Sequence, residues 1–260
     1  MRDVNVRVRD HFISRTKLFV NLLKSKCCKI VSSKYKFSKT FPIRRIIMNL
    51  TILAYASICL SALFILILVV LHFLKPDLSP LWRMISEYEI GRYGWMMRVA
   101  FFSWGASVLT LVIAIWTSLA NVEGIIGRWW LVLLSIAMIG AGVFKTNPIT
   151  ENKPNPTNTI HTFCGSLVIL TFPIAATLVT TSLLHDALWQ AAKGQMIPGL
   201  ILVWLGMILF FASIIISRMI HPSAGRNGPD IYLGWPNRFL VVAYNVWLIL
   251  VGTSAIILLK

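Results

Sequence analysis

Six stretches of the chain are long, apolar and almost free of charged side chains. A helix rises 1.5 Å per residue, so about 20 such residues span the hydrocarbon core of a bilayer. Only 13% of all residues are charged and 57% are apolar, whereas a typical soluble domain has about 25% charged residues. The chain is therefore predicted to be an all-α, polytopic membrane helix bundle of about six transmembrane helices, at residues 50–74, 95–119, 129–144, 161–184, 197–217 and 239–259.

Two of the predicted helices have unusual features. The third is short, but Arg128 and Lys145 flank it, and such long side chains can extend to the membrane surface. Pro173 lies inside the fourth helix and lacks a backbone N–H, so we expect a bend there that neighbouring helices accommodate. Small residues in the third and fifth helices predict close contact between helices: Ala137, Gly140, Ala141, Gly142, Gly199 and Gly206.

The first 47 residues differ in composition from the rest of the chain. They hold 13 of the 25 Lys and Arg residues but only two acidic residues, Asp3 and Asp10. Three interpretations stay open: a cytoplasmic polybasic arm, an organelle transit peptide, or a segment that is not translated, with Met48 as the start. Residues 1–47 are expected to be disordered or dispensable, and residues 48–260 to form the membrane domain. The lipid bilayer, with its anionic surface, is the expected partner of the basic charge; no nucleic acid is expected.

Six spans place the first, third and fifth connections, residues 75–94, 145–160 and 218–238, at the same end of the bundle. These connections hold most of the charged side chains that follow the first helix. The prolines on either side of Asn155 predict that the third connection is a rigid turn region without a helix. Such a polar face is either the mouth of a binding site or a rim of solvated ion pairs.

Seven residues at this polar face are candidates for binding a ligand. Guanidinium groups bind phosphate and carboxylate groups through paired hydrogen bonds, so the arginines favour an anionic lipid or a small anionic molecule. Ser86 has an alternative role as the cap of a short helix, three residues before Glu89. The candidates are Ser86, Glu87, Arg98, His161, Arg218, Asn237 and Arg238.

Three histidines near the polar face indicate a second chemistry. Imidazole groups bind zinc and, in pairs, haem, so His72, His161 and His221 form a candidate metal site. Their spacing matches no metal motif, and hydrogen-bonded histidines at the membrane interface are the alternative. The identity of any cofactor stays open.

Two segments resemble a known family. I-S-E-Y-E-I-G-R-Y-G-W-M-M-R at residues 85–98 and G-W-P-N-R at residues 234–238, together with His161, are similar to DUF998, a family of uncharacterised multi-pass membrane proteins. The likeness covers about residues 50–259. It implies about six helices and a prokaryotic cell (inner) membrane, and it supplies no activity. The chain departs from the family at Asn147, where an acidic residue after Thr146 is expected in many relatives.

Three functional classes follow from these features. The first is a membrane protein that binds or moves an anionic or lipid-like ligand at the polar face, through Arg98, Arg218 and Arg238. The second is a metal-assisted membrane hydrolase that uses the three histidines and a carboxylate such as Glu87. The third is a structural partner of another membrane complex. Whether the protein is an enzyme stays open at this stage.

Overall fold

The six apolar stretches fold into six long helices in a computed structural model of the chain, which describes residues 40–151, 155–223 and 228–258. Each helix contains a segment long and apolar enough to cross a membrane, and no strand occurs within these described ranges. The prediction of an all-α membrane helix bundle is therefore confirmed. The long helices are α2 (Thr40–Leu74), α3 (Gly94–Ala114), α4 (Val122–Val143), α5 (Pro156–Leu184), α6 (Lys193–Ile220) and α7 (Gly234–Leu258), with short 3-10 helices η1 (Ile85–Glu89), η2 (Trp116–Ser118) and η3 (Trp189–Ala192) between them.

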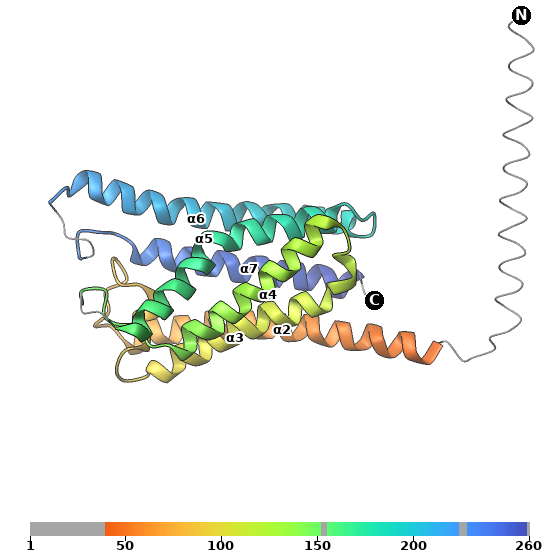
Figure 1. Ribbon diagram of the computed structural model, residues 1–260, viewed down its shortest axis with the longest axis horizontal. Coiled ribbons are helices and arrows are strands. Elements are labelled where there is room, and N and C mark those ends of the chain that lie inside the picture. Colours follow the sequence, from red (N-terminus) through yellow and green to blue (C-terminus); the bar gives the residue numbers. More distant parts are fainter. Residues whose placement is uncertain (1–39, 152–154, 224–227, 259–260) are drawn as a thin grey trace, which may run out of the picture. The chain divides into compact units, whose positions relative to one another are not determined.

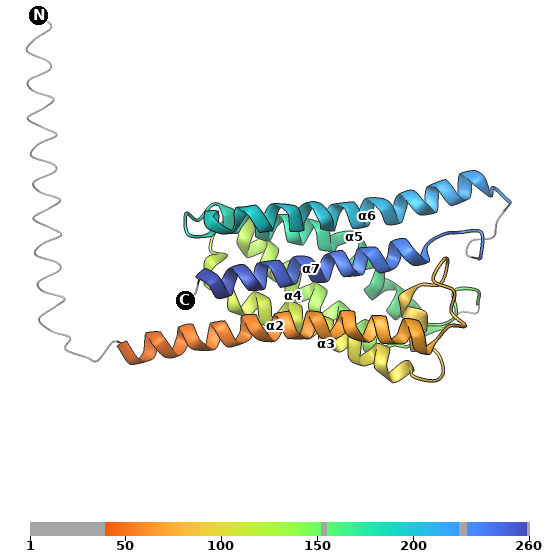
Figure 2. The same ribbon diagram turned by 180° about the vertical axis from the view of Figure 1, so that it is seen from behind.

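The helices pack mainly against their neighbours in sequence. α3, α4 and α5 pack in succession, and α6 packs along α7 (Figures 1 and 2). α2 joins α3 through hydrogen bonds from the hydroxyls of Ser57 and Ser61 to that of Ser107, at 3.2 and 2.6 Å. In α7, 67% of the most apolar segment is buried, against 22% in α6. The last helix therefore forms the centre of the bundle, and α6 presents most of its surface to the outside.

Glycine lets two pairs of helices approach closely. A β-carbon at Gly206 of α6 would lie 3.1 Å from the Cα of Leu240 in α7. One at Gly140 of α4 would lie 3.0 Å from the Sγ of Cys164 in α5. Both distances are shorter than an optimal carbon contact of about 3.5–4.0 Å. The predicted packing role of the small residues is confirmed at these two positions.

Pro173 lies inside α5, and this helix bends along its length (Figure 1). The C-terminal half of α5 runs beside α6, and its N-terminal half turns away from α6 (Figure 1). Because proline has no N–H, the carbonyl of Ile169, four residues earlier, loses its helical donor. The hydroxyl of Tyr244 in α7 donates to this carbonyl at 2.9 Å, and the Tyr244 ring stacks on that of Phe172 with centroids 4.4 Å apart. A neighbouring helix thus satisfies the group that proline leaves free, as predicted.

α5 begins at Pro156 and not at residue 161. The side-chain oxygen of Asn155 accepts the N–H of Thr157 at 3.0 Å, which caps the helix. Proline suits the first helical position because the N–H that it lacks has no partner there. The prediction that the third connection holds no helix is therefore wrong for its last residues.

α4 begins at Val122 and not at residue 129. The side-chain oxygen of Asn121 caps it by accepting the N–H of Gly124 at 2.8 Å. Arg128, predicted to lie before the helix, lies within it, and its Nη1 donates to the carbonyls of Trp116 and Leu119 at 3.3 Å each. The helix can include a charged residue because η2 and the residue that follows it supply acceptors for its guanidinium group.

The other boundaries also differ from the predicted spans. α3 ends at Ala114, before the turn η2, and not at residue 119. α6 begins at Lys193 and α7 at Gly234, both before their apolar stretches. α2 begins at Thr40, inside the segment that was predicted to be disordered or dispensable; residues 1–39 lie outside the described residues. Apolar runs locate the parts that fit a membrane, whereas helices continue into polar ends wherever backbone groups find partners.

Hydrogen bonds hold the odd-numbered connections together at one end of the bundle. The N–H of Gly234 donates to the carbonyl of Leu81 at 2.9 Å, which joins the fifth connection to the first. The N–H of Ile149 donates to Glu87 at 2.9 Å, which joins the third connection to the first. The predicted grouping of these three connections is therefore confirmed.

Candidate functional site

The short helix η1 supplies two buried glutamates to the polar end of the bundle. Glu87 and Glu89 are 1% and 5% exposed, and they lie between α2 and α3 in the chain. A buried carboxylate needs a counter-charge and hydrogen-bond donors to offset the loss of water. Each glutamate finds an arginine and at least one backbone N–H.

Glu87 joins the first connection to the third. Its Oε1 accepts from Arg83 Nη1 at 2.5 Å and from the N–H of Ile149 at 2.9 Å. Its Oε2 accepts from the N–H of Met84 at 3.2 Å, at the start of η1. Glu87 is therefore the residue whose side chain caps this short helix, and the predicted capping role of Ser86 is wrong.

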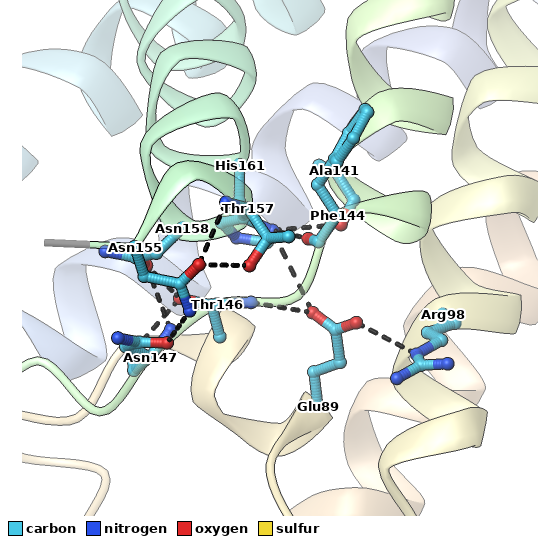
Figure 3. Close-up of polar contacts among 10 residues, drawn as sticks. All are labelled: Glu89, Arg98, Ala141, Phe144, Thr146, Asn147, Asn155, Thr157, Asn158 and His161. Carbon is cyan, nitrogen blue, oxygen red and sulfur yellow. Dashed lines mark hydrogen bonds and ion pairs between the residues drawn. The ribbon is translucent and has the colours of Figure 1, made fainter.

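Glu89 joins η1 to α3 and to the start of the third connection (Figure 3). Its Oε1 accepts from Arg98 Nε at 2.9 Å, and its Oε2 accepts from the N–H of Thr146 at 3.4 Å. The Oε2 atom also lies 3.9 Å from Nδ1 of His161. Burial raises the pKa of this carboxyl group, and the hydrogen bonds from Thr146 and from the Arg98 guanidinium oppose that shift. Through its contacts with Arg98 and Thr146, Glu89 holds the third connection against α3.

Asparagine side chains shape the third connection itself (Figure 3). Asn158 Oδ1 accepts from the N–H of Asn147 at 2.9 Å and from the hydroxyl of Thr146 at 3.3 Å. Asn155 Nδ2 donates to Asn147 Oδ1 at 3.0 Å. At position 147, where many relatives are expected to have an acidic residue, the amide oxygen takes the acceptor role.

The start of α7 attaches to the first connection. Asn237 Oδ1 accepts the N–H of Ile85 at 3.1 Å. Arg238 donates from Nη1 to the carbonyl of Arg83 at 2.8 Å and from Nη2 to the hydroxyl of Tyr88 at 2.8 Å. The two sequence segments that resemble the family, 85–98 and 234–238, thus contact each other in the structure.

A cavity of about 1000 Å³ begins at this polar network and extends between α5 and α6. All of its α5 lining residues precede Pro173, on the half of the helix that turns away from α6. Phe163 and Leu170 on its wall are 66% and 50% exposed, so the cavity reaches the outer surface of the bundle. Its polar end, at the connections and the start of α5, includes Glu87, Asn147, Asn158 and His161. Its apolar lining, from inside the helices, includes Phe101, Trp104, Val168, Ile169, Phe210 and Val241.

The structure divides the seven predicted ligand-binding residues into two groups. Four of them line the cavity: Ser86, Glu87, His161 and Asn237. Three do not: Arg98 pairs with Glu89, Arg238 donates to backbone carbonyls and Tyr88, and Arg218 is exposed at the end of α6. No lysine or arginine occurs among the described residues of the lining.

The three histidines have different neighbours. His72 Nδ1 lies 3.4 Å from the hydroxyl of Tyr88, and its ring packs near that of Trp235. His161 bonds to backbone carbonyls of α4 and its C-terminal cap, and His221 packs near Tyr232. Within the described ranges, no group of three or more His, Cys, Asp or Glu side chains is arranged to hold a metal ion.

Several residues of the site were not among the predicted candidates. Glu89, Asn147 and Asn158 hold the polar end together, and Lys75 donates from its ammonium group to the carbonyls of Tyr88 and Ile90. Burial lowers the pKa of Lys75. The sequence S-E-Y-E could have identified Glu89 as a residue of the site, because two acidic residues beside an apolar stretch need charged or hydrogen-bonding partners.

Comparison with known proteins gives one match. A family model described as "Protein of unknown function (DUF998)" matches residues 58–254, most of the chain. The chain belongs to the DUF998 family. The match covers parts of all six long helices together with η1 and the start of α7, so the predicted resemblance is confirmed. No curated protein and no solved structure matches. With its six apolar helices, this DUF998 member is a multi-pass membrane protein.

Proposed function

We propose that this DUF998 member binds a lipid-like amphipathic molecule in the cavity between α5 and α6. The observation that carries the proposal is the mixed lining of the cavity. Amide, imidazole and carboxylate groups come from the connections and the first two turns of α5, and aromatic and aliphatic groups come from inside α3, α5, α6 and α7. A volume of about 1000 Å³ is at the upper end of ligand pockets, which are roughly 300–1,000 Å³. From the family likeness, we further propose that the surrounding membrane is a prokaryotic cell membrane.

The exposed part of the cavity wall supports entry from the bilayer. Phe163, Ser166 and Leu170 are exposed and follow one another at helical spacing on α5. A residue that faces outward within a membrane span contacts acyl chains. A lipid can therefore insert its chain between α5 and α6 without leaving the apolar phase.

The arginines of the polar end support a structural role more than anion binding. Arg83 and Arg98 pair with buried glutamates, and Arg238 is held by carbonyls and Tyr88. A guanidinium group that already has acidic or carbonyl partners has fewer N–H donors left for a phosphate. The proposed ligand is therefore lipid-like, and its polar group meets the amides and His161.

A residue that fills the cavity tests the proposal. Gly165 lines the cavity, and a β-carbon built there has no atom within 4 Å, so the side chain of Gly165→Phe can begin there without a contact at its β-carbon. Gly194→Phe is the matched control, because Gly194 lies at the start of α6, has the same open space and does not line the cavity. Lipid that remains on the purified protein is counted by native mass spectrometry.

The wild-type protein and the Gly194→Phe variant are expected to retain a lipid that Gly165→Phe has lost. Equal lipid occupancy in all three proteins would contradict binding in this cavity. A thermal melt of each variant shows whether it is folded, so that loss of lipid is not mistaken for loss of structure.

A further inference from the structure

His161 is held in one orientation by two backbone acceptors. Its Nδ1 lies 2.9 Å from the carbonyl oxygen of Ala141 and 2.9 Å from that of Phe144, at the C-terminal end of α4 (Figure 3). A carbonyl oxygen only accepts hydrogen bonds, so Nδ1 must carry the hydrogen. The Phe101 ring meets the imidazole edge to face, with centroids 5.8 Å apart. Both contacts restrict rotation of the ring.

This orientation leaves the other ring nitrogen available for a ligand. When Nδ1 carries the hydrogen of a neutral imidazole, Nε2 carries a lone pair and accepts. Nε2 has no hydrogen-bond partner among the described residues. His161 is buried, and it lines the cavity. The polar end of the cavity therefore presents a fixed acceptor.

The charges around this acceptor favour a ligand that donates. The two charged side chains in the described lining are the carboxylates of Glu87 and Glu151, of which Glu87 is paired with Arg83. The side-chain nitrogens of Asn147 and Asn158 also have no partner among the described residues, and they can donate to oxygen atoms of the same ligand. An amine beside a phosphate matches both sets of groups.

We infer that the cavity recognises a zwitterionic amine lipid, whose amine N–H donates to Nε2 of His161 and whose phosphate oxygens accept from Asn147 and Asn158. The inference rests on the proposed function, because it names the polar group of the lipid in that same cavity. His161 is a binding residue in this arrangement, and the two asparagines complete the recognition of the head group.

The test compares three phospholipids with identical acyl chains. Phosphatidylethanolamine has amine N–H donors, phosphatidylcholine is its N-methylated counterpart without donors, and phosphatidylglycerol is anionic. Binding of each to the full chain is measured by native mass spectrometry. The wild-type protein is expected to bind the ethanolamine lipid roughly threefold to tenfold more tightly than the choline lipid, because the choline lipid cannot form the hydrogen bond to Nε2.

His161→Asn is the matched variant. The amide nitrogen of asparagine replaces Nδ1 and keeps a donor for the carbonyls of Ala141 and Phe144, while Nε2 is removed. It is expected to bind the ethanolamine and choline lipids equally. His185→Asn, at an exposed histidine near Asn121, is expected to keep the wild-type preference.

The outcomes separate this inference from the proposed function. The inference is overturned if the wild-type protein binds the ethanolamine and choline lipids equally, or if it binds the glycerol lipid most tightly. In either case, lipid binding that is abolished by Gly165→Phe still supports binding in the cavity. If Gly165→Phe binds all three lipids as the wild-type protein does, both the inference and the proposed function are overturned. Because the wild-type comparison stands by itself, the inference can be tested even where His161→Asn does not fold.

Discussion

At the scale of single residues, the polar end depends on a few close contacts between distant segments. Gly234 begins α7, and a β-carbon there would lie 2.2 Å from the carbonyl oxygen of Pro80. The absence of a side chain lets its N–H reach the carbonyl of Leu81 at 2.9 Å. The adjacent residues Asn237 and Arg238 then reach η1 and Arg83. Glycine is thus required at the start of G-W-P-N-R because the first connection lies too close for a side chain.

Gly234→Ala is expected to destabilise the fold by about 1–3 kcal/mol, because the new methyl group forces backbone atoms apart. Thermal unfolding in detergent measures the effect. Gly228→Ala is the control, since a β-carbon at Gly228 meets nothing within 4 Å. Equal melting temperatures for the two variants would contradict the close approach of the two segments.

Glu89 is expected to make stability depend on pH. Burial raises the pKa of its carboxyl group above the ordinary value of 4.5, so the folded state keeps the proton over a range in which the unfolded chain has released it. The free energy of unfolding therefore falls as pH rises from the ordinary pKa through the raised one. Glu89→Gln removes this contribution.

The melting temperature of the wild-type protein should accordingly fall relative to that of Glu89→Gln as the pH is raised from the ordinary carboxyl pKa of 4.5 through the raised one. Glu151→Gln, at an exposed carboxylate, controls for a change in net charge. A difference between wild type and Glu89→Gln that is constant over this range would show that burial does not shift the Glu89 pKa.

At the scale of the helices, the bend in α5 links packing to the cavity. The cavity wall uses the half of α5 before Pro173, and the bend lets that half leave α6. The carbonyl of Ile169, which lies in the wall, accepts from Tyr244. α7 therefore stabilises the bent form of α5 as well as filling the centre of the bundle.

Tyr244→Phe removes one donor and leaves the Ile169 carbonyl without its partner, which is expected to cost about 1–3 kcal/mol. Pro173→Ala restores a backbone N–H to that carbonyl. The loss caused by Tyr244→Phe should therefore be smaller in a Pro173→Ala background, and a double-mutant cycle of thermal unfolding measures the coupling. Additive effects of the two changes would contradict the compensation of proline by tyrosine.

At the scale of the whole molecule, the bundle has one polar end, built from the first, third and fifth connections, and an opposite end formed by the second and fourth connections. Glu151 belongs to the polar end, and Lys193 is the first residue of α6, at the other end of the bundle. Single cysteines at these two positions, in a chain whose own cysteines are replaced, are expected to react with an impermeant thiol reagent from opposite sides of the membrane. Reaction from the same side would exclude the six-span arrangement.

The orientation of the bundle is expected to depend on where translation starts. Basic residues prefer the cytoplasmic side. With residues 1–47 present, 13 Lys and Arg should hold the amino terminus inside and leave the polar end outside. In a chain that begins at Met48, nine basic residues at the polar end outweigh three at the other, so the polar end should be cytoplasmic. Reporters fused to the carboxyl terminus of both chains measure this, and an identical location would show that the basic segment does not set orientation.

Much of the fold could be predicted from the sequence, but less of the site. The arginines were predicted to bind an anion because guanidinium groups pair with phosphate and carboxylate groups, yet Arg98 and Arg238 have partners from other segments. Glu87 and His161 were predicted as candidates and do line the cavity. Their ligand-binding role stays a prediction, as does the dispensability of the basic segment.

The sequence by itself determined the six membrane helices, their order and the end at which the polar residues gather, because the length and apolarity of a helix are local properties. Only the tertiary structure decided which polar groups are already paired and which face a cavity. The pair formed by Ile85 and Asn237 shows why: 152 positions separate the two residues, and no local pattern specifies contacts between segments so far apart. The cavity likewise depends on how a bent α5 departs from α6, a geometry that arises only when the helices pack together.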